Sequence, residues 1–277
     1  MRRFILSGAM LLLLSAWCGT TQAQCGGTAC GDVACCNPCC GCPENYGFTG
    51  GVDLTFFRLY GQSGAGGGGA SGGTDDMFPD YNTAIDGRLW IGYEMQNGVG
   101  LRARFVEWEG TERYVGSART ADFEIYDIEA TLDVTYGNWD FTGFAGFRFG
   151  SIELNSSDFG ESHLYDFDGA GLTIGGDFNR PLFGEVALIG GVRYSVLYGN
   201  TEFRPNPAVL SHTYVDITEV RLGLEWSREL GRGRFFASAA WEQQVYGTDT
   251  YFPFAIDPES HGDVSLGGPV FSIGIDR

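Results

Sequence analysis

The sequence contains no lysine, only three histidines and, beyond residue 42, no cysteine. All 17 basic residues are arginine and stand against 35 acidic residues, which gives a net charge of -18 at pH 7. A chain this acidic repels the phosphate backbone, so we expect no nucleic-acid partner. With so few histidines and no calcium-loop motif, the sequence predicts no metal site and no cofactor. Arginine suits paired carboxylates in confined places, although codon bias would give the same composition.

Long apolar runs are absent after residue 23, because no window of 18 apolar residues occurs there, and this excludes a spanning helix. The chain opens MRRFILSGAMLLLLSAWCGTTQA, with two arginines, an apolar run and small residues before the end. We interpret residues 1–23 as a signal peptide that is removed before Gln24. A retained anchor helix is the alternative, but the run from Phe4 to Ala16 is shorter than the roughly 20 residues that span a bilayer.

Apart from Cys18 in the predicted signal peptide, the cysteines are confined to the segment that follows, residues 24–45, which holds seven of them and which we interpret as a Cys-rich periplasmic extension. An exported protein meets an oxidising compartment, where disulfides form, and an odd number of cysteines leaves one for a bond to a partner or to a second copy of the chain. A zinc site or a redox motif at Cys36 and Cys39 is the competing interpretation. The disulfide candidates are Cys25, Cys30, Cys35, Cys36, Cys39, Cys40 and Cys42.

From residue 46 onward the chain alternates apolar and polar residues with the period of a β-strand. The segment YDIEATLDVTY (126–136) has an apolar face from Tyr126 to Tyr136 and carboxylates opposite. Helical periodicity is nearly lacking, so the predicted fold class is all-β. The predicted strands are residues 46–60, 83–95, 100–109, 122–136, 139–150, 165–178, 183–198, 213–227, 234–246 and 264–276.

The connections between these strands alternate between long and short. Bacterial outer-membrane barrels have an even number of antiparallel strands, short periplasmic turns and longer outer loops, whereas a soluble sandwich has no reason to sort its loops by length. We therefore predict that residues 46–277 form a ten-stranded antiparallel transmembrane up-and-down β-barrel in the outer membrane. The predicted long loops are residues 61–80, 110–121, 151–164, 199–212 and 247–263, and the short turns are 96–99, 137–138, 179–182 and 228–233.

Aromatic residues lie on the apolar face of these strands near both ends, as expected for the two aromatic girdles of a barrel embedded in outer-membrane lipid. Between the girdles the same face is aliphatic, for example at Ile128 and Leu132. The predicted girdle at the short turns is Phe48, Tyr93, Tyr136, Trp139, Phe178, Trp226 and Phe235, and that at the long loops is Tyr60, Phe105, Tyr126, Phe149, Tyr198, Tyr214 and Trp241.

The opposite face carries charges of both signs, which we predict to line the lumen because a charge facing lipid costs about 2 to 4 kcal/mol at the midplane. Around a two-residue turn at 137–138, the register predicts an ion pair between Asp127 and Arg148, with Glu129 diagonal to the same guanidinium. The predicted lumen residues are Asp53, Asp86, Arg88, Glu94, Arg102, Arg104, Asp127, Glu129, Asp133, Arg148, Asp177, Glu185, Arg193, Glu219, Arg221 and Glu225.

Such a lumen admits two interpretations, a conduit for small solutes or ions and a plug of salt bridges. Eight strands leave room only for side chains, so ten strands favour a narrow or plugged lumen. Acidic residues also gather in the predicted outer loops, where they either bind divalent cations or are solvated. These residues are Asp75, Asp76, Asp80, Asp158, Glu161, Asp166, Asp168, Asp257, Glu259 and Asp263.

Four segments, residues 88–110, 125–134, 167–199 and 219–247, carry a resemblance to a known family. They resemble the pore-forming outer-membrane proteins related to the Legionella major outer-membrane protein, and most closely the planctomycete-type members with a Cys-rich amino terminus. The resemblance implies porin-like passage of small solutes or ions. The chain departs from such porins in its short length and in ending Ile275-Asp276-Arg277, without a terminal aromatic residue.

Two other function classes compete with a pore. The first is a non-conducting structural or surface-anchoring barrel, cross-linked through residues 24–45. The second is an omptin-like surface protease, which would need an Asp pair and a His-Asp pair over the barrel mouth to activate water. Asp75, Asp76 and His212 lie in predicted outer loops, but the position two before His212 is Leu210 and the other histidines, His163 and His261, stand singly. We therefore predict no catalytic residues.

Overall fold

The computed structural model describes residues 47–61, 83–114, 117–158, 161–204, 208–231, 233–248 and 264–276. Among these residues there is no helix long and apolar enough to cross a membrane. The predicted signal peptide, the Cys-rich extension and all seven disulfide candidates lie outside the described residues.

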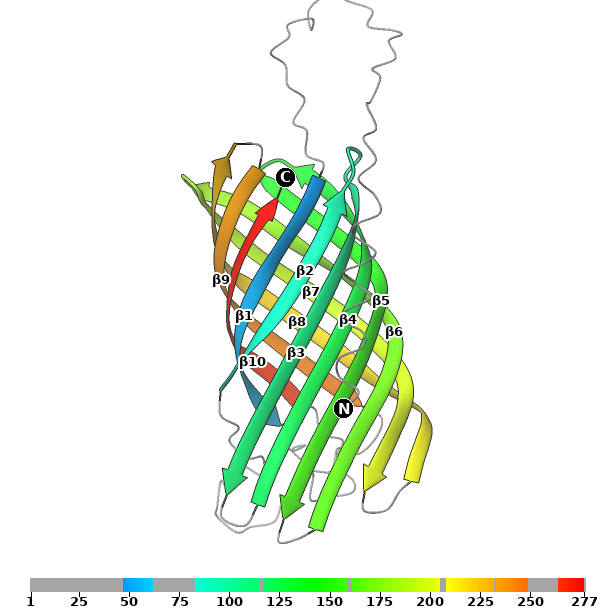
Figure 1. Cartoon of the computed structure of the whole chain (residues 1–277). Helices are drawn as coiled ribbons and strands as arrows, with labels where there is room; N and C mark the ends of the chain where they lie inside the picture. Colours follow the sequence, from blue (N-terminus) through cyan, green and yellow to red (C-terminus); the bar gives the residue numbers. More distant parts are fainter. Residues whose placement is uncertain are drawn as a thin grey trace, which may run out of the picture. The chain divides into compact units, whose positions relative to one another are not determined.

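Ten antiparallel strands close into one barrel, in which each strand pairs with its neighbours in the sequence and the last strand pairs with the first (Figure 1). This confirms the predicted fold class. The strands are β1 (Gly47–Gly61), β2 (Ala84–Glu94), β3 (Val99–Tyr114), β4 (Ser117–Tyr136), β5 (Trp139–Asp158), β6 (Glu161–Phe183), β7 (Val186–Arg204), β8 (Ala208–Leu230), β9 (Gly233–Thr248) and β10 (Val264–Asp276).

Short turns join the strands at the end where β1 begins and β10 ends, the short-turn end. The turn between β4 and β5 has two residues, with Tyr136 paired to Trp139, and Gly137 adopts a φ of 62°, a conformation that glycine reaches without a steric penalty. One predicted turn is displaced. Residues 179–182 continue β6, and the turn falls at residues 184–185, where Gly184 has a φ of 56°.

Three of the five predicted outer loops are wrong in extent. β3 to β8 continue through most of residues 110–121, 151–164 and 199–212, so the connections shrink to residues 115–116, 159–160 and 205–207. The strands continue because the alternation does: Ala121, Ile152 and Leu154 follow the same two-residue period and are fully buried inside the barrel. The longer connections are therefore still at the outer end, but most of their length is paired hairpin.

The outward face of the barrel is apolar. Ile128 is 53% exposed and Leu132 51%, whereas Glu129 between them is 0% exposed and lies inside. The predicted girdle residues lie on this outward face, except Tyr60, whose side chain is not described. Several pack against each other across strands, for example Phe105 on Tyr126 at 4.8 Å and Tyr198 on Tyr214 at 6.4 Å between ring centroids. A closed barrel with an apolar outer surface and charged side chains in its lumen is an outer-membrane barrel.

Close contact between the backbones of β4 and β5 requires glycine at position 146. A Cβ built on Gly146 would lie 2.0 Å from the carbonyl oxygen of Ile128, a distance that no real Cβ contact shows. Gly143, three residues earlier on the same strand, would place its Cβ no nearer than 3.9 Å to the carbonyl oxygen of Leu132.

We therefore expect Gly146→Ala to destabilise the barrel by about 1 to 3 kcal/mol, because the strands must move apart. Gly143→Ala is the matched control and should be neutral or slightly stabilising, since alanine restricts the unfolded chain. The measurement is the temperature at which the folded, fast-migrating band is lost on unheated gels. Equal midpoints for the two variants would show that β4 and β5 are not so closely apposed.

Candidate functional site: the lumen of the barrel

Inward-facing side chains change character along the barrel axis. Near the short-turn end they border an open cavity, here called the vestibule. Farther in they form a layer of ion pairs, and toward the outer end they are apolar and tightly packed. Each strand contributes to this sequence of layers with the same two-residue period, so the interior is built by alternation alone.

The first ion pair of the lumen follows from the hairpin of β4 and β5. Asp127 and Arg148 are direct cross-strand partners, and Arg148 Nε donates to Asp127 Oδ1 at 2.6 Å. This confirms the predicted pair. The predicted second partner is wrong: Glu129 accepts from Arg102 and Arg193, whereas Arg148 Nη1 lies 2.6 Å from Glu219. Arg148 extends across the lumen to β8 and does not bend along its own hairpin.

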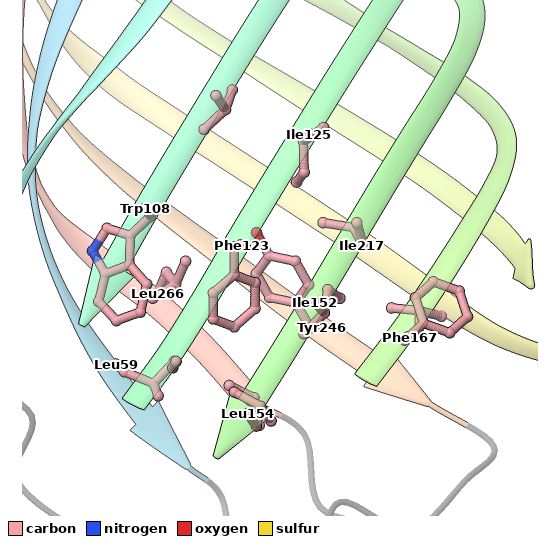
Figure 2. Packing of buried hydrophobic residues seen from close by; sticks show 14 of the residues in the cluster. Leu59, Trp108, Phe123, Ile125, Ile152, Leu154, Phe167, Ile217, Tyr246 and Leu266 are labelled. Atoms are coloured by element: carbon pink, nitrogen blue, oxygen red, sulfur yellow. The ribbon is translucent and has the colours of Figure 1, made fainter. Parts of the chain in front are cut away.

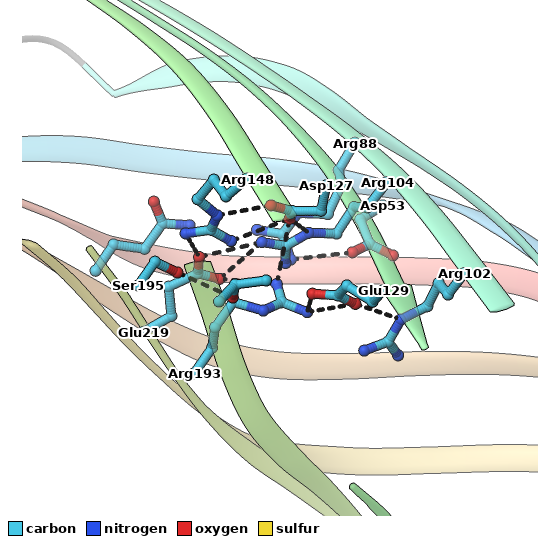
Figure 3. A network of polar contacts seen from close by, with 12 residues as sticks. Asp53, Arg88, Arg102, Arg104, Asp127, Glu129, Arg148, Arg193, Ser195 and Glu219 are labelled. Atoms are coloured by element: carbon cyan, nitrogen blue, oxygen red, sulfur yellow. Dashed lines mark hydrogen bonds and ion pairs between the residues drawn. The ribbon is translucent and has the colours of Figure 1, made fainter. Parts of the chain in front are cut away.

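Most of these ion pairs join strands on different sides of the barrel (Figure 3). Arg88 on β2 makes a bidentate contact with Glu242 on β9, at 2.6 and 3.0 Å. Arg104 on β3 donates to Asp127 at 2.8 Å and reaches Glu219 at 3.1 Å. We call the whole set the ion-pair network: Arg88, Arg102, Arg104, Arg148, Arg193 and Arg221 with Asp53, Asp127, Glu129, Asp177, Glu219 and Glu242.

The network balances six guanidinium groups with six carboxylates, and most of its side chains are buried. Desolvating these ions is costly, and only their mutual pairing in good geometry offsets that cost. Two of the arginines also lie over an aromatic ring, with Arg102 and Arg193 at 4.7 and 4.5 Å from the centroid of Phe144. The side chains thus brace the barrel across its lumen and fill it at this depth.

Beyond the network the lumen is filled by a hydrophobic cluster, here called the apolar plug (Figure 2). Trp108 packs edge-on against Phe123 at 5.5 Å, and Phe123 lies 4.9 Å from Tyr246 on the other side of the lumen. Such packing excludes water. The plug consists of Phe57, Leu59, Val106, Trp108, Ala121, Phe123, Ile125, Ile152, Leu154, Tyr165, Phe167, Leu197, Val215, Ile217, Tyr246, Val264, Leu266 and Val270.

The vestibule has a volume of about 800 Å³ and extends from the ion-pair network to the short-turn end. Its wall contains Trp90 and Phe236, whose rings are nearly parallel at a centroid distance of 6.0 Å. A cavity of this size is within the range of small-molecule sites. Its charged lining consists of Asp53, Arg88, Glu94, Arg102, Arg104, Asp133, Asp140, Asp177, Arg193, Glu219, Arg221, Glu225, Glu229, Arg234, Glu242 and Asp276.

The structure distributes the predicted lumen residues over these layers. Most belong to the network, while Glu94, Asp133 and Glu225 line the vestibule. Asp86 faces inward near the outer end of β2, where it accepts a hydrogen bond from the backbone N–H of Glu109 at 3.3 Å. The prediction that Glu185 lines the lumen is wrong. Glu185 lies in the turn after β6, is half exposed and accepts a hydrogen bond from the indole N–H of Trp226.

Some lumen residues were missed by sequence reasoning. Glu242 is the partner of Arg88, and Arg234 and Asp276 pair at 2.5 Å at the short-turn end. Glu242 follows Trp241, which was assigned to the outward girdle, so the alternation alone indicated that Glu242 points inward. The same alternation applies to Arg234, which precedes the girdle residue Phe235, whereas no residue of β10 had been assigned to the outward face, so Asp276 had no such neighbour.

Outer acidic residues are only partly described. Asp166 and Asp168 lie on β6, and a row of directly paired carboxylates crosses five strands there, namely Glu109, Asp122, Glu153, Asp166 and Glu202. Within the described ranges no group of three or more His, Cys, Asp or Glu side chains is arranged to hold a metal ion. The remaining predicted outer carboxylates have no described side chains.

Of the residues named for the protease alternative, the structure describes the side chain of His212 alone. Asp75, Asp76 and His261 lie outside the described residues, as does the side chain of His163. His212 is described: it has a φ of 69° and is the extra residue of a β-bulge in β8, between Ser211 and Thr213.

No protein-family model and no curated protein matches the chain. Among solved structures it is similar to the outer membrane protease OmpT from Escherichia coli, at 8% identity and a TM-score of 0.44 over 84% of this chain and 96% of that chain. The transport unit of the autotransporter AIDA-I from E. coli follows at 12% identity and a TM-score of 0.38, covering 83% and 88% of the two chains. The P. putida toluene transporter TodX has 7% identity and a TM-score of 0.35, covering 85% and 90%. Likenesses this distant carry no argument about function.

Removing Arg148 tests the ion-pair network. We expect Arg148→Met to destabilise the barrel by about 3 to 5 kcal/mol, because Asp127 and Glu219 lose a shared partner in a buried site. Glu185→Gln, which removes a charge from the exposed turn, should change stability by less than about 1 kcal/mol. Denaturant titration of both variants in lipid vesicles, followed by tryptophan fluorescence, measures the difference. An Arg148→Met midpoint equal to that of Glu185→Gln would mean that the network does not brace the barrel.

Proposed function

We propose that this outer-membrane barrel is a non-conducting structural or anchoring protein. The observation that supports the proposal is that two successive layers of side chains fill the lumen, the ion-pair network and the apolar plug. An ion entering from the short-turn end would have to displace paired charges, and then cross a hydrophobic layer in which few polar groups could replace its hydration shell. Both steps oppose passage through the closed barrel.

Anchoring would come from the Cys-rich extension that precedes β1. In this proposal the seven cysteines of residues 25–42 connect the barrel to a periplasmic partner or to a second copy of the chain, while the apolar outward face holds the barrel in outer-membrane lipid. A filled barrel suits an anchor because side chains that pack the lumen stabilise the barrel, and an anchor does not need an open channel.

Porin-like passage of small solutes or ions is the second candidate. It is favoured by the vestibule, which provides a charged, water-accessible path through part of the lumen, and by the resemblance to pore-forming outer-membrane proteins. Passage would require both filled layers to rearrange. Neither candidate includes an enzymatic activity.

Conductance in planar bilayers separates these candidates. We expect the purified barrel to give no discrete current steps. The matched control is a variant in which smaller side chains replace members of both filled layers: Trp108→Ala, Phe123→Ala, Tyr246→Ala, Arg148→Ser and Glu219→Ser. If this variant folds, it should conduct, and its current steps would show that the assay detects inserted barrels. Steps from the unmodified barrel as frequent as those of a general porin would overturn the non-conducting proposal.

Gel mobility with and without reductant tests anchoring. We expect the full chain isolated from the envelope to migrate as a disulfide-linked species that dithiothreitol converts to a monomer. A variant with all seven cysteines of residues 25–42 changed to serine should be monomeric in both lanes and retain the folded barrel band. A monomer without reductant in the unmodified chain would contradict cross-linking.

A further inference from the structure

The vestibule has an uneven distribution of charge. At its floor, next to the ion-pair network, five arginines and four carboxylates line the cavity; at the short-turn rim, one arginine stands against six carboxylates. Because the floor arginines also pair with Asp127 and Glu129 of the ion-pair network, and Arg148 completes that network, the floor is balanced in charge, whereas the rim has a large excess of negative charge. The rim carboxylates are Glu94, Asp133, Asp140, Glu225, Glu229 and Asp276.

Buried polar atoms at the floor lack hydrogen-bond partners among the described residues. Arg193 is 6% exposed and its Nε has no partner, and the same is true of Arg88 Nε and Arg102 Nη2. All three arginines line the vestibule. These N–H groups have almost no accessible surface of their own, so an anionic oxygen in the cavity can bond to them only when the guanidinium group turns toward it. Guanidinium groups that line a cavity and retain unpaired N–H donors suit a carboxylate, which they bind through parallel hydrogen bonds.

The rim has the opposite chemistry. Glu94 on β2, Asp133 on β4 and Asp276 on β10 border the same opening. Arg234 pairs with Asp276 at 2.5 Å and with Glu225 at 3.5 Å, whereas the described ion pairs include neither Glu94 nor Asp133. Crowded carboxylates at the mouth of a cavity attract a cation and repel a free anion. A ligand that reaches the floor with a carboxylate must therefore also carry a positive charge.

Between rim and floor the wall offers an apolar surface. Trp90 and Phe236 lie on the same row of paired residues as Gly51 and Gly274, and their rings cover these glycines: a Cβ on Gly51 would lie 2.9 Å from the Trp90 ring, and one on Gly274 would lie 2.3 Å from the Phe236 ring. The two rings thus lie flat against the wall and leave room beside them. Flat aromatic faces bind aliphatic groups and peptide planes.

The length of the vestibule limits the size of the ligand. Along β10, Asp276 at the rim is four residues from Ser272, whose hydroxyl accepts from Arg221 at the floor. Four residues of strand span roughly 13 Å, or about 10 Å along the axis at a tilt near 40°. An extended chain of three or four residues covers about the same distance, at roughly 3.3 to 3.6 Å per residue.

We propose that the vestibule binds a short peptide with free termini, with its carboxylate on the floor arginines and its ammonium group at the rim carboxylates. The peptide enters from the short-turn, periplasmic end. This function goes beyond the structural role proposed above and does not depend on whether the barrel conducts.

Four matched peptides test the proposal: tetraalanine, its N-acetyl form, its C-terminal amide and the form blocked at both ends. Isothermal titration into the full chain in non-ionic micelles measures their affinities, with empty micelles as the blank. We expect tetraalanine to bind best, and blocking either terminus to weaken binding about tenfold or more, because each block removes a charge-assisted contact. Equal affinity for all four peptides, or no binding, overturns the proposal. Preference for the amide over tetraalanine also overturns it, since it would indicate a cation site only.

Two variants assign the termini. In the rim variant, Glu94→Gln with Asp133→Asn, the advantage of tetraalanine over its N-acetyl form should fall toward one, while its advantage over the amide persists. Arg102→Gln should show the reverse, and Glu185→Gln, outside the vestibule, should change neither ratio. Each variant is first checked for the folded band. If a variant does not fold, the four peptides on the unmodified chain still decide the outcome, and ratios that both variants leave unchanged overturn the assignment.

Discussion

Within a hydrocarbon layer a backbone N–H or C=O group has no water to bond, and this constraint determines the rest of the structure. Ten antiparallel strands satisfy it only when β10 closes onto β1, because an open edge would leave a row of unpaired groups facing lipid. Closure in turn divides every strand into an outward and an inward face. The outward face must be apolar, as at Ile128, so the charges of an acidic chain are confined to the lumen, to the turns and to the outer hairpins.

Charged side chains inside the closed lumen must be paired, because burial removes them from water. At the depth of the network, each buried carboxylate has at least one arginine partner, and Asp127 and Glu219 are each shared by Arg104, Arg148 and Arg193. Arginine suits this role since its planar group bonds to two carboxylates at once, as Arg104 does. Farther out, where the strands rise as paired hairpins, the same inward positions carry Phe123 and Ile152 and exclude water. The same alternation of inward and outward residues thus produces both the ion-pair network and the apolar plug.

Alternation also explains what could be predicted from sequence. The order of strands, their orientation and the Asp127–Arg148 pair follow from the two-residue period and a two-residue turn. What lies across the lumen does not. Phe123 and Ile125 have the same parity as Asp127, so the alternation predicts only that they face inward. That they form part of an apolar plug depends on Tyr246 and Ile217, which lie on distant strands. The partners of Glu129 and the vestibule likewise depend on strands far apart in the chain. The extent of the outer loops was misjudged because polar residues such as Glu153 suggested a loop, although Glu153 alternates with the buried Ile152 and Leu154 on a continuing strand.

The ion pairs across the lumen join positions that are far apart in the sequence. Arg88 and Glu242 are separated by 154 positions and Arg104 and Glu219 by 115. Neighbouring hairpins can assemble locally, whereas these contacts become favourable only after the loop-closure entropy of most of the chain has been lost. The ion-pair network therefore forms after the hairpins, as the cylinder closes. In the reverse direction, parting the β1–β10 seam disrupts ion pairs on several strands together, which gives the mature barrel a high barrier to unfolding and a long native lifetime.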